Sequence, residues 1–332
     1  GGRSYPGIYG SSPRSFLLVN DRQGRFTDQT TSLLPEIESI GMVCSAEWAD
    51  LTGDGSKELV VVGEWMAPRI FEYKGNKFTE IPTNLNSLHG WWQSVKLADL
   101  NGDGRQDLVL GNIGENFYLR PDAKNPVKLW INDFDQNGSV EKIMTSSING
   151  KDMPVFLKKD MEDQLPSIKK QNLKNEVYAD KSIQEIFPAA LLGKSIIRQF
   201  DYPSSCVAYN QGNGQFRIEK LPAMSQLSCI NVIRVLDVNE DGRPDLVTGG
   251  NQFGFLPQFE KLDGSFGDVL LNDGKGGWRW QESAKTGLRF RGEMRDIGVL
   301  KLGDKTGMVF LQNNQYPVLC VLNGPEDRQK GK

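Results

Sequence analysis

Four short acidic segments recur along the chain, and each interrupts an apolar run that alternates with a period of two. They are called here the first to fourth loops: Asp50–Glu58, Asp99–Asp107, Asp133–Glu141 and Asp237–Asp245. In the second loop, DLNGDGRQD, oxygen-bearing side chains stand at positions one, three, five and nine, with glycine at position six. Alternate residues of a tight loop can point such oxygens toward one centre, and Ca2+ prefers six to eight oxygen ligands. The pattern therefore predicts four calcium loops.

Position seven can add a backbone carbonyl oxygen, so five positions of each loop are candidate ligands. The candidate calcium ligands are Asp50, Thr52, Asp54, Ser56, Glu58, Asp99, Asn101, Asp103, Arg105, Asp107, Asp133, Asp135, Asn137, Ser139, Glu141, Asp237, Asn239, Asp241, Arg243 and Asp245. The first loop is expected to bind Ca2+ least tightly, because Thr52 replaces a stronger ligand. Mg2+ is the second choice of ion, since it prefers a small octahedral shell with retained water. We expect the ion to stabilise the fold, because carboxylates packed into one turn repel each other without it.

An EF-hand is the obvious alternative, but it requires a bidentate glutamate at position twelve and a helix after the loop. The twelfth positions here are Val61, Leu110, Met144 and Thr248, and β-like runs such as DLVLG follow the loops. The EF-hand interpretation therefore fails four times. A metal-free turn rich in Asp, Asn and Gly is the other alternative. Four copies with an acid fixed at position nine favour the calcium interpretation.

A second pattern accompanies the loops: an apolar run, a turn containing Asn or Gly, and an aromatic residue, as in IFEYKGNKFTEI and VAYNQGNGQFRIEKLP. This pattern is typical of β-hairpins. The first residues of the four loops are 49, 34 and 104 residues apart. Repeated loop-plus-hairpin units predict an all-β fold, a β-propeller of about six blades with five to seven possible. A sandwich does not repeat such a unit so regularly, and the repeats of a β-helix are shorter.

The longest gap between loops is expected to hold about two repeats and a helical insertion near 158–198, where a Lys-, Glu- and Gln-rich composition replaces the strand pattern. Residues 296–322 are predicted to form a degenerate repeat without a full ligand set. Each end of the chain carries half a blade by this count. Joining the two halves in one blade would close the ring and remove exposed strand edges. Residues 1–332 are therefore expected to form a single propeller domain.

The loop-plus-hairpin units resemble the FG-GAP or VCBS repeats of integrin-α-like β-propellers. The order of segments is more specifically similar to bacterial VCBS-repeat proteins related to the ASPIC/UnbV and cartilage-acidic-protein family. The stretches that carry this similarity include INDFDQNGSVEKIM, VYADKSIQEIF, LDVNEDGRPDLVTGGN and GEMRDIGVLKL. The resemblance implies a secreted, periplasmic or cell-surface propeller that binds other molecules and holds Ca2+ in its loops.

Composition excludes several other classes of partner and location. A formal net charge of -3 without a Lys/Arg-rich cluster argues against a nucleic-acid partner. No run approaches the roughly 20 apolar residues of a membrane span, so no transmembrane segment is expected. The first residues, GGRSYPGIYG, lack the basic and apolar regions of a signal peptide. We expect them to follow an upstream segment of a longer chain, and the oligomeric state is left open.

The cysteines and the single histidine give no sign of a zinc or catalytic site. No CxxC pair is present, and each cysteine lies in an apolar run, which favours free buried thiols, with one or two disulfides as the alternative. The cysteines are Cys44, Cys206, Cys229 and Cys320. His89 is the only histidine and has no cysteine or histidine near it in sequence. A zinc site or a Ser-His-Asp triad is therefore not predicted.

A binding, adhesion or scaffold module for a protein or glycan is the favoured function, with a purely structural module as a further option. Aromatic anchors dominate many interfaces, and Trp91 and Trp92 are the favoured ligand-binding candidates. Trp48, Trp130 and Trp280 fall in strand patterns and are expected to pack between blades. Extracellular Ca2+ is high enough to fill weak sites, which supports an extracytoplasmic location.

A polysaccharide lyase or glycosidase on a propeller scaffold is the alternative function. It would need a carboxylate pair or a Lys or Arg base outside the metal loops. The residues available for this are Glu64, Glu115, Glu293 and Arg295. Their spacing selects none of them, so no catalytic residue is assigned.

Overall fold

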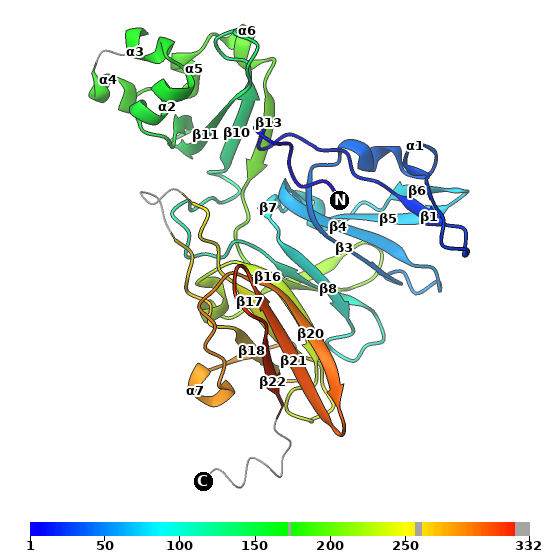
Figure 1. Cartoon of the computed structure of the whole chain (residues 1–332). Helices are drawn as coiled ribbons and strands as arrows, with labels where there is room; N and C mark the ends of the chain where they lie inside the picture. Colours follow the sequence, from blue (N-terminus) through cyan, green and yellow to red (C-terminus); the bar gives the residue numbers. More distant parts are fainter. Residues whose placement is uncertain (172–173, 256–260, 323–332) are drawn as a thin grey trace.

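The computed structural model describes residues 1–171, 174–255 and 261–322. These residues form six antiparallel β-sheets with a few short helices, which confirms the predicted all-β class. Four of the sheets follow one another in a row, since their first strands contact in the order β3, β8, β16 and β20. Figure 1 shows these sheets below a projecting lobe that contains most of the α-helices.

Sheets I and II lie at the N-terminal end of the row. Sheet I contains β3 (Met42–Ala49), β4 (Glu58–Met66), β5 (Arg69–Lys74), β6 (Lys77–Glu80) and β7 (Gly90–Trp91), which pairs with β4. Sheet II contains β8 (Ser94–Ala98), β9 (Asp107–Gly111), β14 (Cys206–Asn210) and β15 (Phe216–Lys220). Every residue of β4 and β9 is buried, as expected for central strands covered on both faces.

Sheets III and IV complete the row. Sheet III contains β16 (Ile230–Leu236), β17 (Asp245–Gly250), β18 (Asp268–Asn272) and β19 (Trp278–Gln281). Sheet IV contains β20 (Met294–Leu302), β21 (Lys305–Gln312) and β22 (Val318–Val321), which confirms the predicted degenerate repeat. One face of sheet IV packs on sheet III through a core that contains Met294, Phe310 and Val247. Its other face leaves Leu300, Leu319 and other apolar side chains partly exposed.

The projecting lobe is an insertion between β9 and β14 of sheet II (Figure 1). Its insertion sheet contains β10 (Val127–Asn132), β11 (Glu141–Ile148), β12 (Lys151–Pro154) and β13 (Ile196–Phe200). Its helices are α2 (Lys158–Gln164), α3 (Ser167–Gln171), α4 (Asn175–Ala179), α5 (Ile183–Ile186) and α6 (Ala189–Leu192). The predicted helical insertion is thus confirmed, but strand β13 forms its C-terminal boundary.

The remaining elements are short. The N-terminal hairpin pairs β1 (Leu18–Asn20) with β2 (Phe26–Asp28). The other helices are α1 (Thr30–Leu33), the 3-10 helices Pro35–Ser39, Asn84–Ser87 and Ala223–Gln226, and α7 (Ser283–Thr286). None of the helices in the described ranges has the length and apolar character needed to cross a membrane.

Two expectations about the repeats are corrected by this topology. The 104-residue gap between the third and fourth loops does not hold two further blades, because β14 and β15 complete sheet II instead. The two chain ends do not share a blade among the described residues, since the N-terminal hairpin and sheet IV are separate sheets. About six blades were predicted, and the described residues form six sheets. Only four of these sheets form the row, because the other two are the N-terminal hairpin and the insertion sheet.

The predicted hairpin turns follow from local sequence. Gly75 and Asn76 connect β5 to β6 with φ of 60° and 64°, and Lys74 pairs with Lys77 across them. Two consecutive positive φ values characterise the two-residue turn whose twist suits a hairpin, and Asn and Gly are the residues that adopt it at least cost. The sequence KGNK therefore specifies this turn without help from the rest of the fold.

Candidate metal-binding loops

Each acidic loop connects the first and second strands of one repeat unit. The first, second and fourth loops join β3 to β4, β8 to β9 and β16 to β17, and the third loop joins β10 to β11 in the lobe. A strand follows every loop, so the exclusion of the EF-hand is confirmed. The structure therefore places all of the candidate ligands on four separate strand connections.

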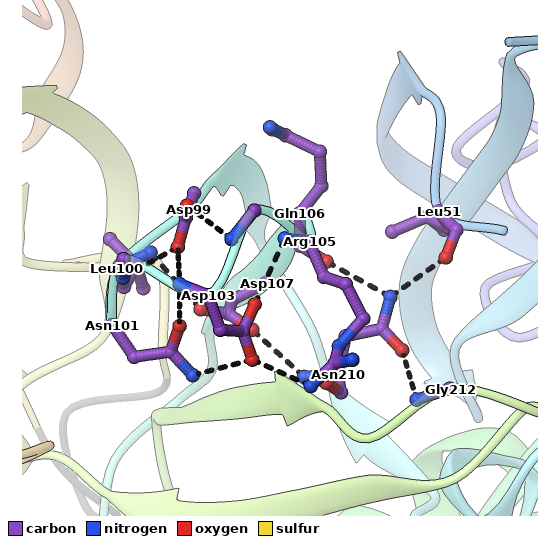
Figure 2. A network of polar contacts seen from close by, with 12 residues as sticks. Leu51, Asp99, Leu100, Asn101, Asp103, Arg105, Gln106, Asp107, Asn210 and Gly212 are labelled. Atoms are coloured by element: carbon purple, nitrogen blue, oxygen red, sulfur yellow. Dashed lines mark hydrogen bonds and ion pairs between the residues drawn. The ribbon is translucent and has the colours of Figure 1, made fainter. Parts of the chain in front are cut away.

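The first residue of each loop holds the turn in place through its carboxylate. In the second loop, the amide of Gly102 donates to Asp99 Oδ1 at 2.7 Å and the amide of Gly104 donates to Oδ2 at 2.8 Å, as Figure 2 shows in part. Gly104 has φ of 85°, a conformation that most side chains disfavour. The same pair of oxygens accepts amide protons in the other three loops. The carboxylate at position one thus points into its loop in all four copies.

The acid at position nine is buried beneath its loop. Glu58, Asp107, Glu141 and Asp245 are each at most 4 % exposed. Each accepts a hydrogen bond from the backbone amide at position two, for example Leu100 N to Asp107 Oδ2 at 3.0 Å. Burial raises the pKa of all four carboxyl groups, and the charges of the other loop acids raise it further. A positive ion in the loop would offset both effects.

The loops divide into two kinds at position seven. In the second and fourth loops this residue is arginine, and Arg105 donates through Nη2 to Asp103 Oδ2 at 2.8 Å. Arg243 pairs with Asp241 in the same way. The first and third loops have serine at this position, so they lack the guanidinium that pairs with an acid in the other two loops. The arginines would therefore compete with a metal ion for a carboxylate in two of the four loops.

The third loop is the best preformed cation site in the described part of the chain. One carboxylate oxygen from each of Asp133, Asp135 and Glu141 lies within 4.8 Å of the others. Two oxygens bound to one Ca2+ at about 2.4 Å can be no farther apart than about 4.8 Å, so this spacing suits the ion. Asn137 donates through Nδ2 to Asp135 Oδ2 at 2.9 Å, and its side-chain oxygen accepts from the backbone amide of Ser139 at 2.7 Å. The residue types and spacing fit Ca2+.

Sequence reasoning missed two asparagines that bind the loops to each other. Asn210 ends β14 of sheet II, and its amide donates to Asp107 Oδ1 at 2.8 Å while its side chain donates to the carbonyl of Leu51 in the first loop at 2.8 Å (Figure 2). Asn272 repeats this arrangement one sheet further, with bonds to Asp245 and to the carbonyl of Leu100. The signal available in the sequence for these contacts was an Asn at the end of a strand, just before a turn that contains glycine.

The prediction that Trp91 and Trp92 bind a ligand at the surface is wrong. Trp91 is 4 % exposed and Trp92 is fully buried. Trp91 stacks on Phe200 with ring centroids 5.1 Å apart, and Trp92 stacks on Tyr202 at 5.7 Å. Both side chains belong to the core, Trp91 at the end of β7, which pairs with β4, and Trp92 directly after it.

The other tryptophans partly follow expectation. Trp130 is buried, but it packs against the helices of the lobe rather than between blades, and Trp280 is half-buried. Trp48 is 44 % exposed, so it does not pack between blades. All four cysteines are free, as predicted, but only Cys206 and Cys229 are buried, and Cys44 and Cys320 are half-buried.

The carboxylates considered for catalysis are held by structural hydrogen bonds. Glu64 accepts from Arg3 and Tyr9 at 2.6 and 2.8 Å. Glu115 accepts from Ser204 and Lys220, each at 2.6 Å. Glu293 accepts from the amide of Phe253, from Asn313 and from Arg295. The three carboxylates and Arg295 are not gathered in one of the clefts of the described structure.

Comparison with known proteins identifies the repeat. Residues 50–110 match the family described as the FG-GAP-like repeat, from the first residue of the first loop to Leu110 in β9. The chain carries an FG-GAP-like repeat. This match contains both the first and the second loops, so the FG-GAP-like repeat runs from one acidic loop to the next rather than from sheet to sheet. The predicted resemblance to FG-GAP or VCBS repeats is thereby confirmed, whereas the relation to the ASPIC/UnbV group stays a prediction.

Comparison of structures gives a weaker similarity. The crystal structure of the V. cholerae biofilm matrix protein Bap1 shares 9% identity, with 96% of this chain and 70% of that chain covered, at a TM-score of 0.32. A similarity at this level does not bear on function. No curated protein matches the chain.

Proposed function

We propose that this protein is a calcium-stabilised FG-GAP-type β-propeller module that acts outside the cytoplasm as a binding, adhesion or scaffold unit for a protein or glycan. The observation that carries the proposal is the third loop, where the oxygens of Asp133, Asp135 and Glu141 lie within 4.8 Å of one another. The match of residues 50–110 to the FG-GAP-like repeat supports the same interpretation for the first and second loops.

A stabilising role for Ca2+ follows from the position of the loops. Each loop fixes the connection between two strands. The acid at position nine of each loop is buried, and burying its negative charge costs free energy unless a cation lies nearby. An ion that binds only the folded chain stabilises it by mass action. Extracellular Ca2+ is abundant enough to occupy such sites, which supports an extracytoplasmic location.

The proposal is tested by measuring thermal unfolding of the protein with excess Ca2+ and after removal of metal with a chelator. Removal should lower the melting temperature by about 3–8 °C, the range expected for loss of a ligand at a large excess over its Kd. Elemental analysis should find bound calcium before chelation. An unchanged melting temperature in protein verified to be metal-free would rule the proposal out.

A pair of matched variants assigns the effect to the loop. Asp135→Asn removes one charge from the third loop and should reduce the bound calcium by one ion per chain. Asp304→Asn makes the same chemical change in the exposed β20–β21 turn, which occupies the equivalent place in sheet IV without the ligand set. This control should keep the full calcium content. Equal calcium content in both variants would show that the third loop is not the site.

A further inference from the structure

A cleft lined by both polar and apolar residues lies where sheet I meets the lobe. Its volume is about 600 Å3, and its walls come from the ends of β4, β5 and β6, from the 3-10 helix Asn84–Ser87 and from β13. Strand β13 of the insertion contacts both β4 and β7, which brings the lobe against sheet I (Figure 1). Clefts between two structural units are common ligand sites.

The charges that line the cleft leave one cation without an ionic partner. Arg69 and Glu80 form a two-pronged ion pair, so their charges cancel. Arg198 donates to the carbonyl of Gly10 at 3.1 Å and to Ser12 Oγ, both of which are uncharged. Within the described residues, no carboxylate lies within ion-pair distance of Arg198. A half-buried guanidinium in this condition favours an anion.

His89 adds an oriented ring to the same cleft. Its Nδ1 lies 3.2 Å from Asp201 Oδ2, and its backbone amide donates to Asp201 Oδ1 at 2.9 Å. Gln199 also donates to Asp201, whose side chain is only 7% exposed behind the ring. The His89 side chain is 36% exposed, so its second ring nitrogen is free to bond a ligand. Asp201 therefore orients His89 and does not itself face the cleft.

The backbone of Trp65 in the cleft wall is strained. This residue has φ of 58°, a left-handed conformation that is costly for a bulky side chain. The other residues of this kind in the described chain are Asn, Gln, Glu and Arg in turns or at strand ends. The indole Nε1 of Trp65 donates to Tyr9 Oη at 3.0 Å. This hydrogen bond holds the Trp65 ring on the side of the cleft wall that faces the core. Strained backbone conformations of this kind cluster at binding sites, where they hold part of the site in its binding geometry before the ligand arrives.

We propose that this cleft binds a glycan through a uronic-acid residue, with Arg198 on the carboxylate and His89 on a neighbouring hydroxyl group. The proposal rests on the proposed function as a binding module and names its ligand class. Asn86 forms part of the wall beside these groups, and its side-chain amide is held by the carbonyl of Pro68, by Glu80 and by the backbone amide of Thr83.

The charge of the lining favours one carboxylate over a more highly charged group. A phosphate or sulfate cluster needs several converging cations, whereas Arg198 is the one cation without an ionic partner among the described residues that line this cleft. A neutral sugar would leave the guanidinium unpaired after water is displaced, which is costly. A uronic-acid residue carries a single negative charge, so it can pair with Arg198 and needs no further cation.

The test is calorimetric titration of the calcium-loaded full chain with a galacturonate trisaccharide, with its methyl ester as a neutral probe. The acid should bind at least tenfold more tightly than the ester. Arg198→Gln and, separately, His89→Gln should each weaken binding of the acid, by about tenfold or more for Arg198. Arg279→Gln removes the same charge from an exposed position on β19 and should bind as the unaltered chain does.

Melting temperatures of the variants show whether they are folded. Equal binding of acid and ester, absence of binding by the unaltered chain, or full binding by folded Arg198→Gln would each overturn the proposal. If Arg198→Gln does not fold, the acid-against-ester comparison on the unaltered chain and the His89→Gln result decide. Calcium-dependent melting without uronate binding would refute the cleft alone, whereas uronate binding without calcium-dependent melting would refute the calcium module alone.

Discussion

The buried carboxylates of this protein are stabilised by specific hydrogen-bond donors. Asp268 on β18 is 7% exposed, and it accepts from Trp280 Nε1 at 2.8 Å and from Ser265 Oγ at 3.4 Å. These neutral donors only partly replace water, so burial raises the pKa of Asp268 to about 6. Ionisation of Asp268 is therefore less favourable in the native state than in the unfolded chain.

Asp268→Asn should change the pH dependence of stability. Because the folded pKa lies above the unfolded value, the native state binds more protons, and the stability this confers is full below about pH 4 and lost as pH rises through about 6. The free energy of unfolding of the unaltered chain, measured relative to the variant, should fall by up to about 3 kcal/mol between pH 4 and pH 7. Urea denaturation across this range measures the difference. Parallel pH profiles would contradict the raised pKa.

At the scale of elements, hairpins and loops of neighbouring sheets are joined by asparagine side chains. Asn210 is 2% exposed and donates to the carbonyls of Leu51 and Gln106, while its own amide oxygen accepts from Gly212. The side chain thus connects the second strand pair of sheet II with the first loop of sheet I. Because the loops are linked this way, each sheet helps to set the shape of the next loop.

Asn210→Ala should destabilise the chain by about 2–3 kcal/mol, since it leaves two carbonyls and one amide without partners in a buried place. Asn175→Ala, at an exposed position in the first turn of α4, is the matched control and should change stability by less than about 0.5 kcal/mol. Guanidinium unfolding of both variants compares them. Similar small effects would mean that Asn210 does not link the sheets energetically.

At the scale of the whole molecule, one apolar core joins the lobe to the row of sheets. It includes Trp65 and Trp91 of sheet I, Leu129 of β10 and Phe200 of β13. The lobe also has its own core between the insertion sheet and the helices, which includes Trp130 and other residues of the insertion. The shared core leads us to propose that residues 1–332 unfold as one domain.

Trp91→Ala should reduce the free energy of unfolding by about 3–5 kcal/mol, because it leaves a large cavity among packed aromatic rings. Trp48→Ala removes an equal side chain from a position that is 44% exposed and should cost much less. Denaturation followed by circular dichroism and by tryptophan fluorescence should give coincident transitions. Separate transitions for lobe and sheets would contradict the single domain.

The features that the sequence determined by itself are those written in short stretches of chain. The acidic loops need only nine residues to bring position-one oxygens and position-six glycine together, and the hairpin turn at Gly75 and Asn76 needs only two positive φ values. The all-β class and the helices of the insertion follow from period and composition in the same local way. These predictions succeeded because the forces that decide them act between near neighbours.

Only the tertiary structure decided which strands are partners. Leu110 pairs with Cys206 across the whole insertion, and His89 meets Asp201 from 112 residues away. A period-two pattern states that a strand has a buried face but not which strand covers it, so the nesting of the lobe within sheet II was hidden. The same reason explains the error at Trp91 and Trp92, whose exposure depends on chain segments that arrive later in the sequence.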